Sequence, residues 1–227
     1  MELLREFCAE NMTHVPAAIE AGARRIELCD NLAVGGTTPS YGVIKAAVAF
    51  AREHDVDVMA MVRPRGGNFF YHEAELQSML DDLSLARWLG VAGVVFGCLR
   101  ERGGHTALDL EAVRRLTDGA KGPGTGCAAG TPPVAITFHM AFDELDAEAQ
   151  LQAIDELATL GVERVLTHGG PAGTPILDNI DHIHELVGHA HGRLTIMPGG
   201  GITWQNAEHV ASLLGVHELH GTKIVRW

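Results

Sequence analysis

The sequence predicts an α/β fold, a (β/α)8 TIM-type barrel that forms a single domain over residues 1–227. Eight short segments have the apolar or alternating pattern of strands, and seven helical segments separate them. Strands that alternate with helices pair in parallel through right-handed crossovers. The length also suits one barrel, because α/β barrels commonly occupy about 200–250 residues as one domain. An open, doubly wound sheet is the alternative architecture.

The first half of the chain contains four of these strands. They are predicted at residues 3–8, 25–29, 56–62 and 91–97. Helices are predicted at residues 13–21, 41–50 and 73–89. Thr13 and Ser40 stand where helix N-caps are expected, and Gly22 and Gly90 stand where helices end. The segment 91–97 is uniformly apolar, which is typical of a strand buried on both faces.

The second half repeats the pattern, with a long loop at residues 119–133 between the helix 109–116 and the strand 134–139. Strands are predicted at 134–139, 162–167, 194–197 and 217–220, and helices at 109–116, 146–160, 176–187 and 203–214. No eighth helix is predicted before the last residue, Trp227. The flank between the last and first strands would then expose apolar surface, so either a partner subunit covers it or the chain lacks a C-terminal part.

Composition narrows the class of protein. The formal charge is −12 without a basic run, which disfavours nucleic acid and anionic membranes as partners. No signal peptide and no long apolar segment is apparent, so we expect a cytoplasmic protein. The four cysteines form no C-x-x-C pair and are expected to be reduced. No nucleotide-binding or hydrolase motif appears, and no organic cofactor is indicated.

Polar residues gather near the predicted carboxyl ends of the strands. Glu27 and Cys29 share one face of the strand 25–29, because side chains alternate along a strand. The carboxyl ends of barrel strands are where ligand sites are built. A register error of one residue would turn any such side chain outward. The same alternation on the other strands selects Glu6, Cys8, Arg63, Arg65, Thr137, His139, Thr167, Met197 and His220.

Two stretches have features of an anion site. Arg63 and Arg65 are followed by two glycines and offer guanidinium groups to a carboxylate or phosphate, although pairing with Glu27 or Glu6 is an equal alternative. Three glycines follow the strand 194–197, where barrels often bind phosphate through backbone N–H groups. The alternative is a tight turn that leads into a helix capped by Thr203. The predicted anion-binding residues are Gly199, Gly200, Gly201 and Gly221.

His139 and Asp143 form a candidate acid–base pair. His139 ends a strand, and Asp143 follows four residues later, close enough for its carboxylate to orient the imidazole. The alternative is a structural histidine with satisfied hydrogen bonds. A Schiff-base aldolase is disfavoured, because Lys45 and Lys121 fall in a helix and a loop.

Five motifs resemble those of the CutC family, which is named for a proposed role in copper homeostasis. They are E-L-C at 27–29, G-G-T-T-P-S-Y-G at 35–42, R-P-R-G-G-N-F at 63–69, F-H-M-A-F-D at 138–143 and P-G-G-G-I at 198–202. The resemblance covers almost the whole chain. It implies a cytosolic, dimeric TIM-type barrel and a proposed copper(I) site on Cys8 and Cys29. Met140, His168 and the residues after His220 depart from the family pattern.

Two hypotheses about function follow. The first is a copper(I)-binding protein that acts in copper homeostasis through Cys8 and Cys29, whose soft thiolates on adjacent strands suit this ion. The second is a barrel enzyme with lyase- or isomerase-type acid–base chemistry on a small anionic or phosphorylated metabolite. Its candidate catalytic residues are Glu27, Arg63, Arg65, His139 and Asp143.

Overall fold

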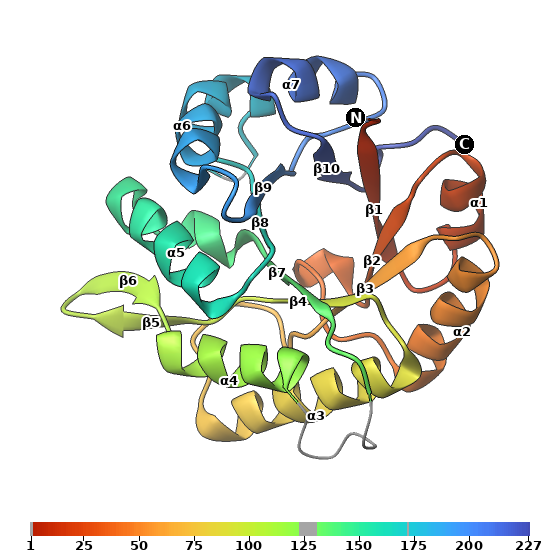
Figure 1. Cartoon of the computed structure of the whole chain (residues 1–227), viewed down its shortest axis with the longest axis horizontal. Coiled ribbons are helices and arrows are strands. Elements are labelled where there is room, and N and C mark those ends of the chain that lie inside the picture. Colours follow the sequence, from red (N-terminus) through yellow and green to blue (C-terminus); the bar gives the residue numbers. More distant parts are fainter. Residues whose placement is uncertain (1, 123–130, 172) are drawn as a thin grey trace.

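Eight parallel strands form a nearly closed barrel in the computed structural model, which describes residues 2–122, 131–171 and 173–227 (Figure 1). The sheet order is β10-β1-β2-β3-β4-β7-β8-β9. Strands β9 and β10 are neighbours, but no ladder joins them in the described residues. The predicted (β/α)8 architecture is therefore confirmed. The barrel strands are β1 (Leu4–Glu10), β2 (Arg25–Cys29), β3 (Asp57–Met61), β4 (Gly93–Phe96), β7 (Ala135–Phe138), β8 (Arg164–Thr167), β9 (Thr195–Pro198) and β10 (Glu218–Gly221).

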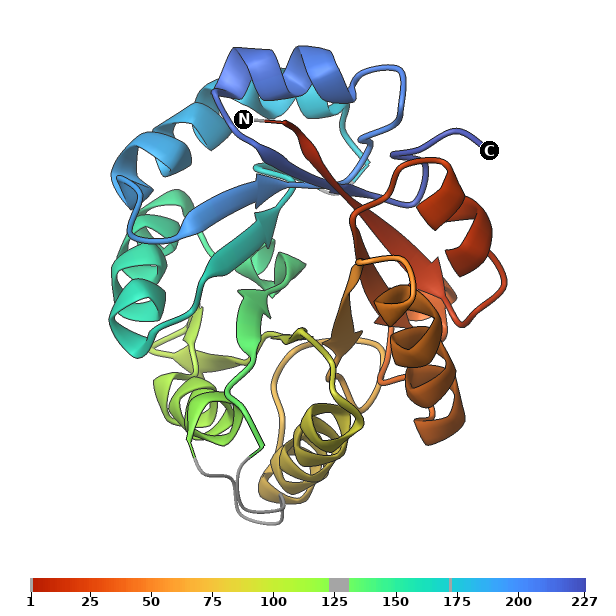
Figure 2. The same cartoon turned by 45° about the vertical axis from the view of Figure 1, so that its right-hand side comes forward.

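Helices surround the strands and alternate with them along the chain (Figures 1 and 2). The described residues form α1 (Val15–Glu20), α2 (Tyr41–Arg52), α3 (Glu73–Leu89), α4 (Leu110–Lys121), α5 (Ala147–Leu160), α6 (Ile180–Ala190) and α7 (Ala207–Leu214). Short 3-10 turns occur at η1 (Leu32–Val34), η2 (Met140–Glu144) and η3 (Ile176–Asn179). All seven predicted helices are present, with boundaries that shift by a few residues.

An antiparallel hairpin projects from the barrel between β4 and α4 (Figure 1). It consists of β5 (Leu99–Arg102) and β6 (His105–Leu108). The sequence analysis did not predict it. Most of its residues are exposed, so their side chains lack the apolar alternation that marks a strand packed on a core.

Helix starts test the predicted caps. Ser40 caps α2, since its hydroxyl accepts a hydrogen bond from the Val43 N–H. Thr13 does not cap α1, because its hydroxyl donates to Asn11 Oδ1 at 2.6 Å instead. Thr203 does not begin α7 either. Its N–H donates to Asn206 Oδ1 at 2.7 Å, and the helix starts one turn later.

The predicted loop at 119–133 is partly helical. Helix α4 begins after the predicted cap Asp109, whose side chain accepts a hydrogen bond from the Ala112 N–H, and continues to Lys121. Residues 123–130 of that loop lie outside the described residues. The helix is therefore longer than the prediction of 109–116, because tertiary packing buries Leu116 and Ala120 on its inner face.

Two apolar cores have different sizes. The larger lies between the sheet and the helices, and the smaller lies inside the barrel. The interior cluster consists of Cys8, Cys29, Met59, Met61 and Val95. It is small because charged and polar side chains fill much of the remaining interior. The charged and polar side chains of the candidate site therefore lie inside the barrel.

The C-terminal segment covers part of the flank beside β1. The chain runs from Thr222 to Trp227 without a helix. The Trp227 ring lies edge-on to Phe7 with ring centroids 5.0 Å apart, and it stacks on His14. This tail takes the place where the repeating pattern would put an eighth helix. No helix among the described residues is long and apolar enough to cross a membrane.

The two predicted caps allow a matched test. Ser40→Ala should lower the free energy of unfolding by about 1 kcal/mol, because the substitution removes an N-cap hydrogen bond. Thr13→Ala should cost less, since Thr13 caps no helix. Urea denaturation followed by circular dichroism measures both. An equal loss in the two variants would contradict the cap assignment.

Candidate functional site

Strand register brings the predicted polar side chains together inside the barrel. Cys8 on β1 pairs with Glu27 on β2, and Glu6 on β1 pairs with His220 on β10. Each of these four side chains is at most 7% exposed, and so is Cys29. The alternation argument is confirmed for β1, β2 and β10. Residues from opposite ends of the chain therefore share one buried cluster.

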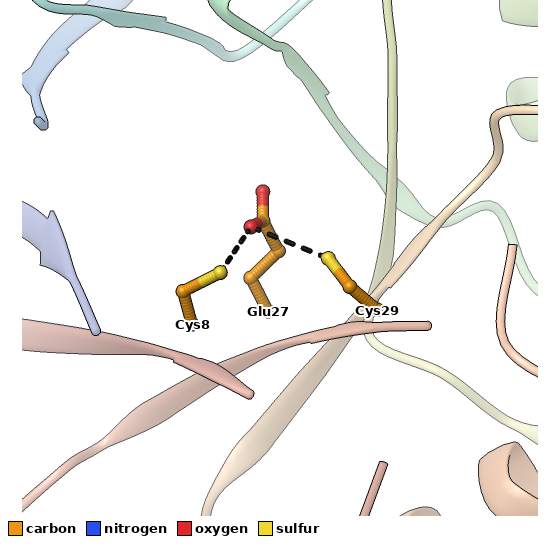
Figure 3. A group of neighbouring side chains, drawn as sticks. All are labelled: Cys8, Glu27 and Cys29. Carbon is orange, nitrogen blue, oxygen red and sulfur yellow. Dashed lines mark hydrogen bonds between the residues drawn. The ribbon is translucent and has the colours of Figure 1, made fainter. Parts of the chain in front are cut away.

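Two thiols point at one carboxylate (Figure 3). The Cys8 thiol donates to Glu27 Oε2 at 3.2 Å, and the Cys29 thiol lies 3.6 Å from the same oxygen. One ligand atom from each residue lies within 4.8 Å of the others. The second oxygen, Glu27 Oε1, is buried without a hydrogen-bond partner. Such an arrangement offers two sulfur donors and one oxygen donor to a metal ion.

Burial and neighbouring charges divide the protons of this cluster unequally. A hydrogen bond from Cys29 and the nearby His220 hold the pKa of Cys8 well below that of an ordinary thiol. The pKa of Cys29 is raised by the hydrogen bond of this thiol to Cys8 and by its burial. Burial raises the pKa of Glu27 well above its usual value. Cys8 is therefore the more acidic of the two thiols, whereas the protonated forms of Cys29 and Glu27 are favoured by their surroundings.

The buried His220 lies next to Glu27 and Cys8. His220 Nδ1 donates to Glu6 Oε1 at 2.8 Å, and Nε2 lies 3.6 Å from Glu27 Oε2. Burial opposes a charge on His220, but Glu27, Cys8 and Glu6 raise its pKa well above the usual value. Burial also opposes a charge on Glu6, yet Arg25 and His220 lower its pKa to about 2. The two groups form a buried ion pair.

Arg25 connects this pair to a second carboxylate. It forms a salt bridge with Glu6, and its Nη2 donates to Glu218 at 2.6 Å. Arg164 Nε donates to the same Glu218 oxygen at 2.7 Å. The sequence analysis missed these three residues. Side-chain alternation could have identified two of them. Arg25 precedes Glu27 by two positions, and Glu218 precedes His220 by two positions, so each pair shares one face of its strand.

A cavity of about 350 Å³ borders the thiol cluster. Apolar side chains form much of its wall, and the predicted residues Cys8, Glu27, Arg63 and His139 contribute to it. The complete lining is Cys8, Glu27, Leu32, Val34, Gly35, Met61, Arg63, Phe69, His139, Met140, Leu166 and His220. Arg65, Asp143 and the predicted anion-binding glycines are not part of this lining.

Arg63 anchors two loops. Its Nη1 donates to the carbonyls of Val34 and Gly36, both at 2.9 Å, and its Nη2 donates to the Gly67 carbonyl at 2.8 Å. The expected alternative of an ion pair with Glu27 or Glu6 is wrong, because carbonyls of the loops after β2 and β3 take these donors.

Arg65 lies on the surface side of the same loop. Its guanidinium forms a salt bridge with Glu75 in the first turn of α3, and its Nη2 donates to the Phe70 carbonyl at 2.9 Å. These contacts hold the loop against the helix and direct the charge away from the cavity.

His139 and Asp143 do not form a pair, so this prediction is wrong. The His139 Nδ1 accepts a hydrogen bond from the Ala141 N–H at 3.1 Å, and Nε2 has no hydrogen-bond partner within residues 2–122, 131–171 and 173–227. The turn η2 instead directs Asp143 toward β8, where it accepts hydrogen bonds from Thr167 Oγ1 and the His168 N–H. Burial and the charge of Arg63 lower the pKa of His139 to about 3. His139 is therefore neutral at physiological pH.

The alternation argument fails on β8. Leu166 lines the cavity and pairs in register with Met197, whereas Thr167 binds the η2 turn. The prediction that Thr167 faces the barrel interior is therefore wrong. A polar residue at the end of a strand can bind the following loop, and its chemistry alone does not reveal which face it occupies.

Close packing accounts for the conformation of the glycine loop. A Cβ on Gly199 would lie 2.6 Å from Leu166 Cδ1, and one on Gly221 would lie 2.5 Å from the Ile202 carbonyl oxygen. The His168 Nδ1 donates to the carbonyls of Gly199 and Gly200. Two carbonyls of the loop therefore accept from His168. Anion binding by these glycines stays a prediction.

Comparisons with known proteins agree on one family. A family model described as the CutC family matches residues 3–225. A family protein CutC of Enterococcus faecalis is 55% identical over 223 residues, which cover 98% of this chain and 100% of that relative. A CutC relative of Streptococcus pyogenes is 42% identical with the same coverage of both chains.

Solved structures show the same fold. A crystal structure from Streptococcus agalactiae, described as a candidate copper homeostasis protein CutC, is 43% identical with a TM-score of 0.89. The alignment covers 98% of this chain and 100% of that one. An aldolase called QR15 has a TM-score of 0.66 at 13% identity and coverages of 96% and 89%, which shows a shared barrel fold alone.

The buried network of Arg25 should matter far more than a surface pair. Arg25→Leu should lower the free energy of unfolding by about 3–5 kcal/mol, because it leaves Glu6 and Glu218 without their shared cation. Arg5→Leu removes a surface pair with Glu208 and should cost at most about 1 kcal/mol. Chemical denaturation at pH 7 compares the variants. Similar losses would show that the network is not stabilising.

His139 should make stability depend on pH. Its pKa of about 3 lies below the value of about 6.5 expected in the unfolded chain, so between these values only the unfolded chain binds this proton. Stability should fall as the pH falls from 6.5, with a limiting slope of about 1.4 kcal/mol per pH unit from this group.

The measurement is denaturation between pH 6.5 and 5. His139→Gln should flatten the pH dependence, since it removes the titrating group. His184→Gln, on the exposed face of α6, serves as the control and should leave the pH dependence unchanged. An unchanged slope in His139→Gln would contradict a buried neutral imidazole.

Proposed function

Because the chain belongs to the CutC family, we propose that it binds copper(I) through Cys8 and Cys29 and acts in copper homeostasis. The observation that carries the proposal is the group of two thiols and the Glu27 carboxyl, whose ligand atoms lie within 4.8 Å of one another. The description of the related Streptococcus agalactiae structure as a candidate copper homeostasis protein supports it.

The donor set suits copper(I). Soft thiolate ligands favour this ion, whereas a structural zinc site usually has four protein ligands. The group at Cys8 and Cys29 offers two sulfurs and one carboxylate oxygen. The neighbouring His220 is a poor fourth ligand, because its pKa is raised and both ring nitrogens carry protons at neutral pH. A low-coordinate ion is therefore the best match.

The charge balance also supports a monovalent ion. A hydrogen bond to Cys8 and burial raise the pKa of Cys29 well above the ordinary value, so the Cys29 thiol carries its proton at neutral pH. Copper(I) bound between both sulfurs would replace that proton, one monovalent cation for another. The buried cluster would then hold the same net charge before and after binding. A divalent ion would add a charge inside the barrel, which is costly.

The enzyme hypothesis has weaker support from the contacts. Asp143 does not reach His139, and Arg65 binds Glu75 outside the cavity. The terminal nitrogens of Arg63 are used by loop carbonyls. A catalytic role for Glu27 would compete with its contacts to both thiols. The homodimer and the cytoplasmic location stay predictions.

The cysteines provide a direct test with an internal control. Cys8→Ser and Cys29→Ser should each weaken copper(I) binding by more than about a hundredfold, since even the loss of an outer partner of a metal ligand typically costs about 10–100-fold. Cys98→Ala should retain the affinity, because Cys98 is buried in the core between sheet and helices. Anaerobic competition against a copper(I) chelator measures the affinities.

Two outcomes would contradict the copper proposal. One is an affinity that Cys8→Ser and Cys29→Ser leave unchanged. The other is an equal loss in Cys98→Ala, which would indicate a general effect of removing a buried thiol. Circular dichroism of each variant establishes that a lost affinity reflects the site and not unfolding.

A further inference from the structure

The cavity above the thiols is larger than a single ion requires. Its volume of about 350 Å³ falls within the range of small-molecule sites, and its wall combines apolar side chains with a few polar groups. Copper bound to Cys8 and Cys29 would occupy one edge of it. His139 and Arg63 supply hydrogen-bond donors at another part of the cavity wall.

His139 offers a buried donor without an acceptor. Its Nδ1 accepts from the Ala141 N–H, so the ring proton is on Nε2. The side chain is 95% buried and lines the cavity, and this Nε2 atom has no hydrogen-bond partner in the part of the chain that the structure describes. An unpaired buried donor is costly. A ligand acceptor in the cavity would satisfy it.

Arg63 carries a buried charge without a carboxylate. It is 4% exposed, and in the described part of the chain it forms no ion pair. Its terminal nitrogens bind neutral carbonyls, the neutral Tyr71 hydroxyl lies nearby, and its Nε has no hydrogen-bond partner among the described residues. A buried cation without a counter-charge is strongly unfavourable. This charge predicts that the ligand is an anion.

Phe69 places these two groups in one part of the cavity. Its ring centroid lies 5.0 Å from that of His139 and 4.8 Å from Arg63 Cζ. Both donors therefore flank the same ring. Two donors and one uncompensated charge match a carboxylate, whereas a phosphate dianion carries more charge and more acceptor oxygens than these groups can pair.

We propose that the cavity binds a small organic monocarboxylate, whose carboxylate accepts hydrogen bonds from His139 Nε2 and Arg63 Nε. Its apolar part would contact Val34, Phe69 and Leu166, which line the same cavity. This site is separate from the two thiols, so it does not depend on the copper proposal.

Calorimetric titration of the reduced, metal-free protein tests the charge requirement. Benzoate and butyrate are the probes, and benzamide and butyramide are neutral controls of similar shape. We expect the acids to bind at least tenfold more tightly than the amides, because a hydrogen bond with a charged partner contributes more than a neutral one. Absence of binding by both acids at millimolar concentration, or equal binding of acid and amide, would overturn the proposal.

Variants test the position. His139→Leu should weaken benzoate binding at least tenfold, and His139→Gln, which keeps a side-chain N–H, should weaken it less. His184→Leu on the exposed face of α6 should change nothing. A benzoate affinity unaffected by His139→Leu would overturn the assignment. Comparison of acid with amide in the unaltered protein keeps the test valid even if His139→Leu does not fold.

The double variant Cys8→Ser/Cys29→Ser separates the two sites. It should lose copper(I) and retain benzoate binding, because neither sulfur contacts the proposed carboxylate position. Loss of copper(I) binding with unchanged benzoate binding would support this proposal. Loss of benzoate binding in a folded double variant would place the anion at the thiols and overturn it.

Discussion

The need to balance charge inside the barrel determines the rest of this structure. Glu6, Arg25, Glu218 and Arg164 form a buried chain of ion pairs that joins β1, β2, β8 and β10. Each carboxylate contacts a cation, so no member of this chain is left as an isolated charge. A TIM barrel can instead fill its interior with branched apolar side chains. Here charged side chains occupy much of the interior, and the apolar cluster inside the barrel consists of Cys8, Cys29, Met59, Met61 and Val95.

The same chain of charges affects the pKa values of the thiols through His220. His220 is held as an imidazolium by Glu6, and it faces Glu27 and Cys8. A positive charge beside a buried thiol stabilises the thiolate, which is the metal-binding form. Burial meanwhile raises the pKa of Glu27, which disfavours a second negative charge beside the sulfurs. The link from fold to chemistry is therefore electrostatic. Strand β1 lies between β10 and β2, so strand register brings Cys8 next to both His220 and Glu27.

The sequence predicted the barrel and the thiol cluster because both follow from periodicity. Alternation placed Glu6, Cys8, Glu27, Cys29 and His220 in one interior, and the structure agrees. It failed where the backbone leaves the strand. Asp143 belongs to a 3-10 turn whose direction is set by hydrogen bonds to Thr167 and His168, and no sequence period encodes that direction. The hairpin β5–β6 escaped notice because it is exposed and has no apolar face. Arg25 and Glu218 were predictable by alternation, but each lies at the amino end of its strand, away from the carboxyl ends where barrel ligand sites are expected.

The cavity has two electrostatically different ends. At the thiols, His220 is paired with Glu6 and also lies near Glu27, so that end has little attraction for an added anion. At Phe69, the Arg63 charge lies beside loop carbonyls, the Phe69 ring and the Tyr71 hydroxyl, and no carboxylate pairs with it in the described residues. The same charge lowers the pKa of His139, which keeps the imidazole a neutral donor and prevents a second cation there. An anion drawn into the cavity would therefore favour the Arg63 end, while a soft cation would favour the sulfurs. Separation of charge within one cavity permits two ligands of opposite sign to occupy it together.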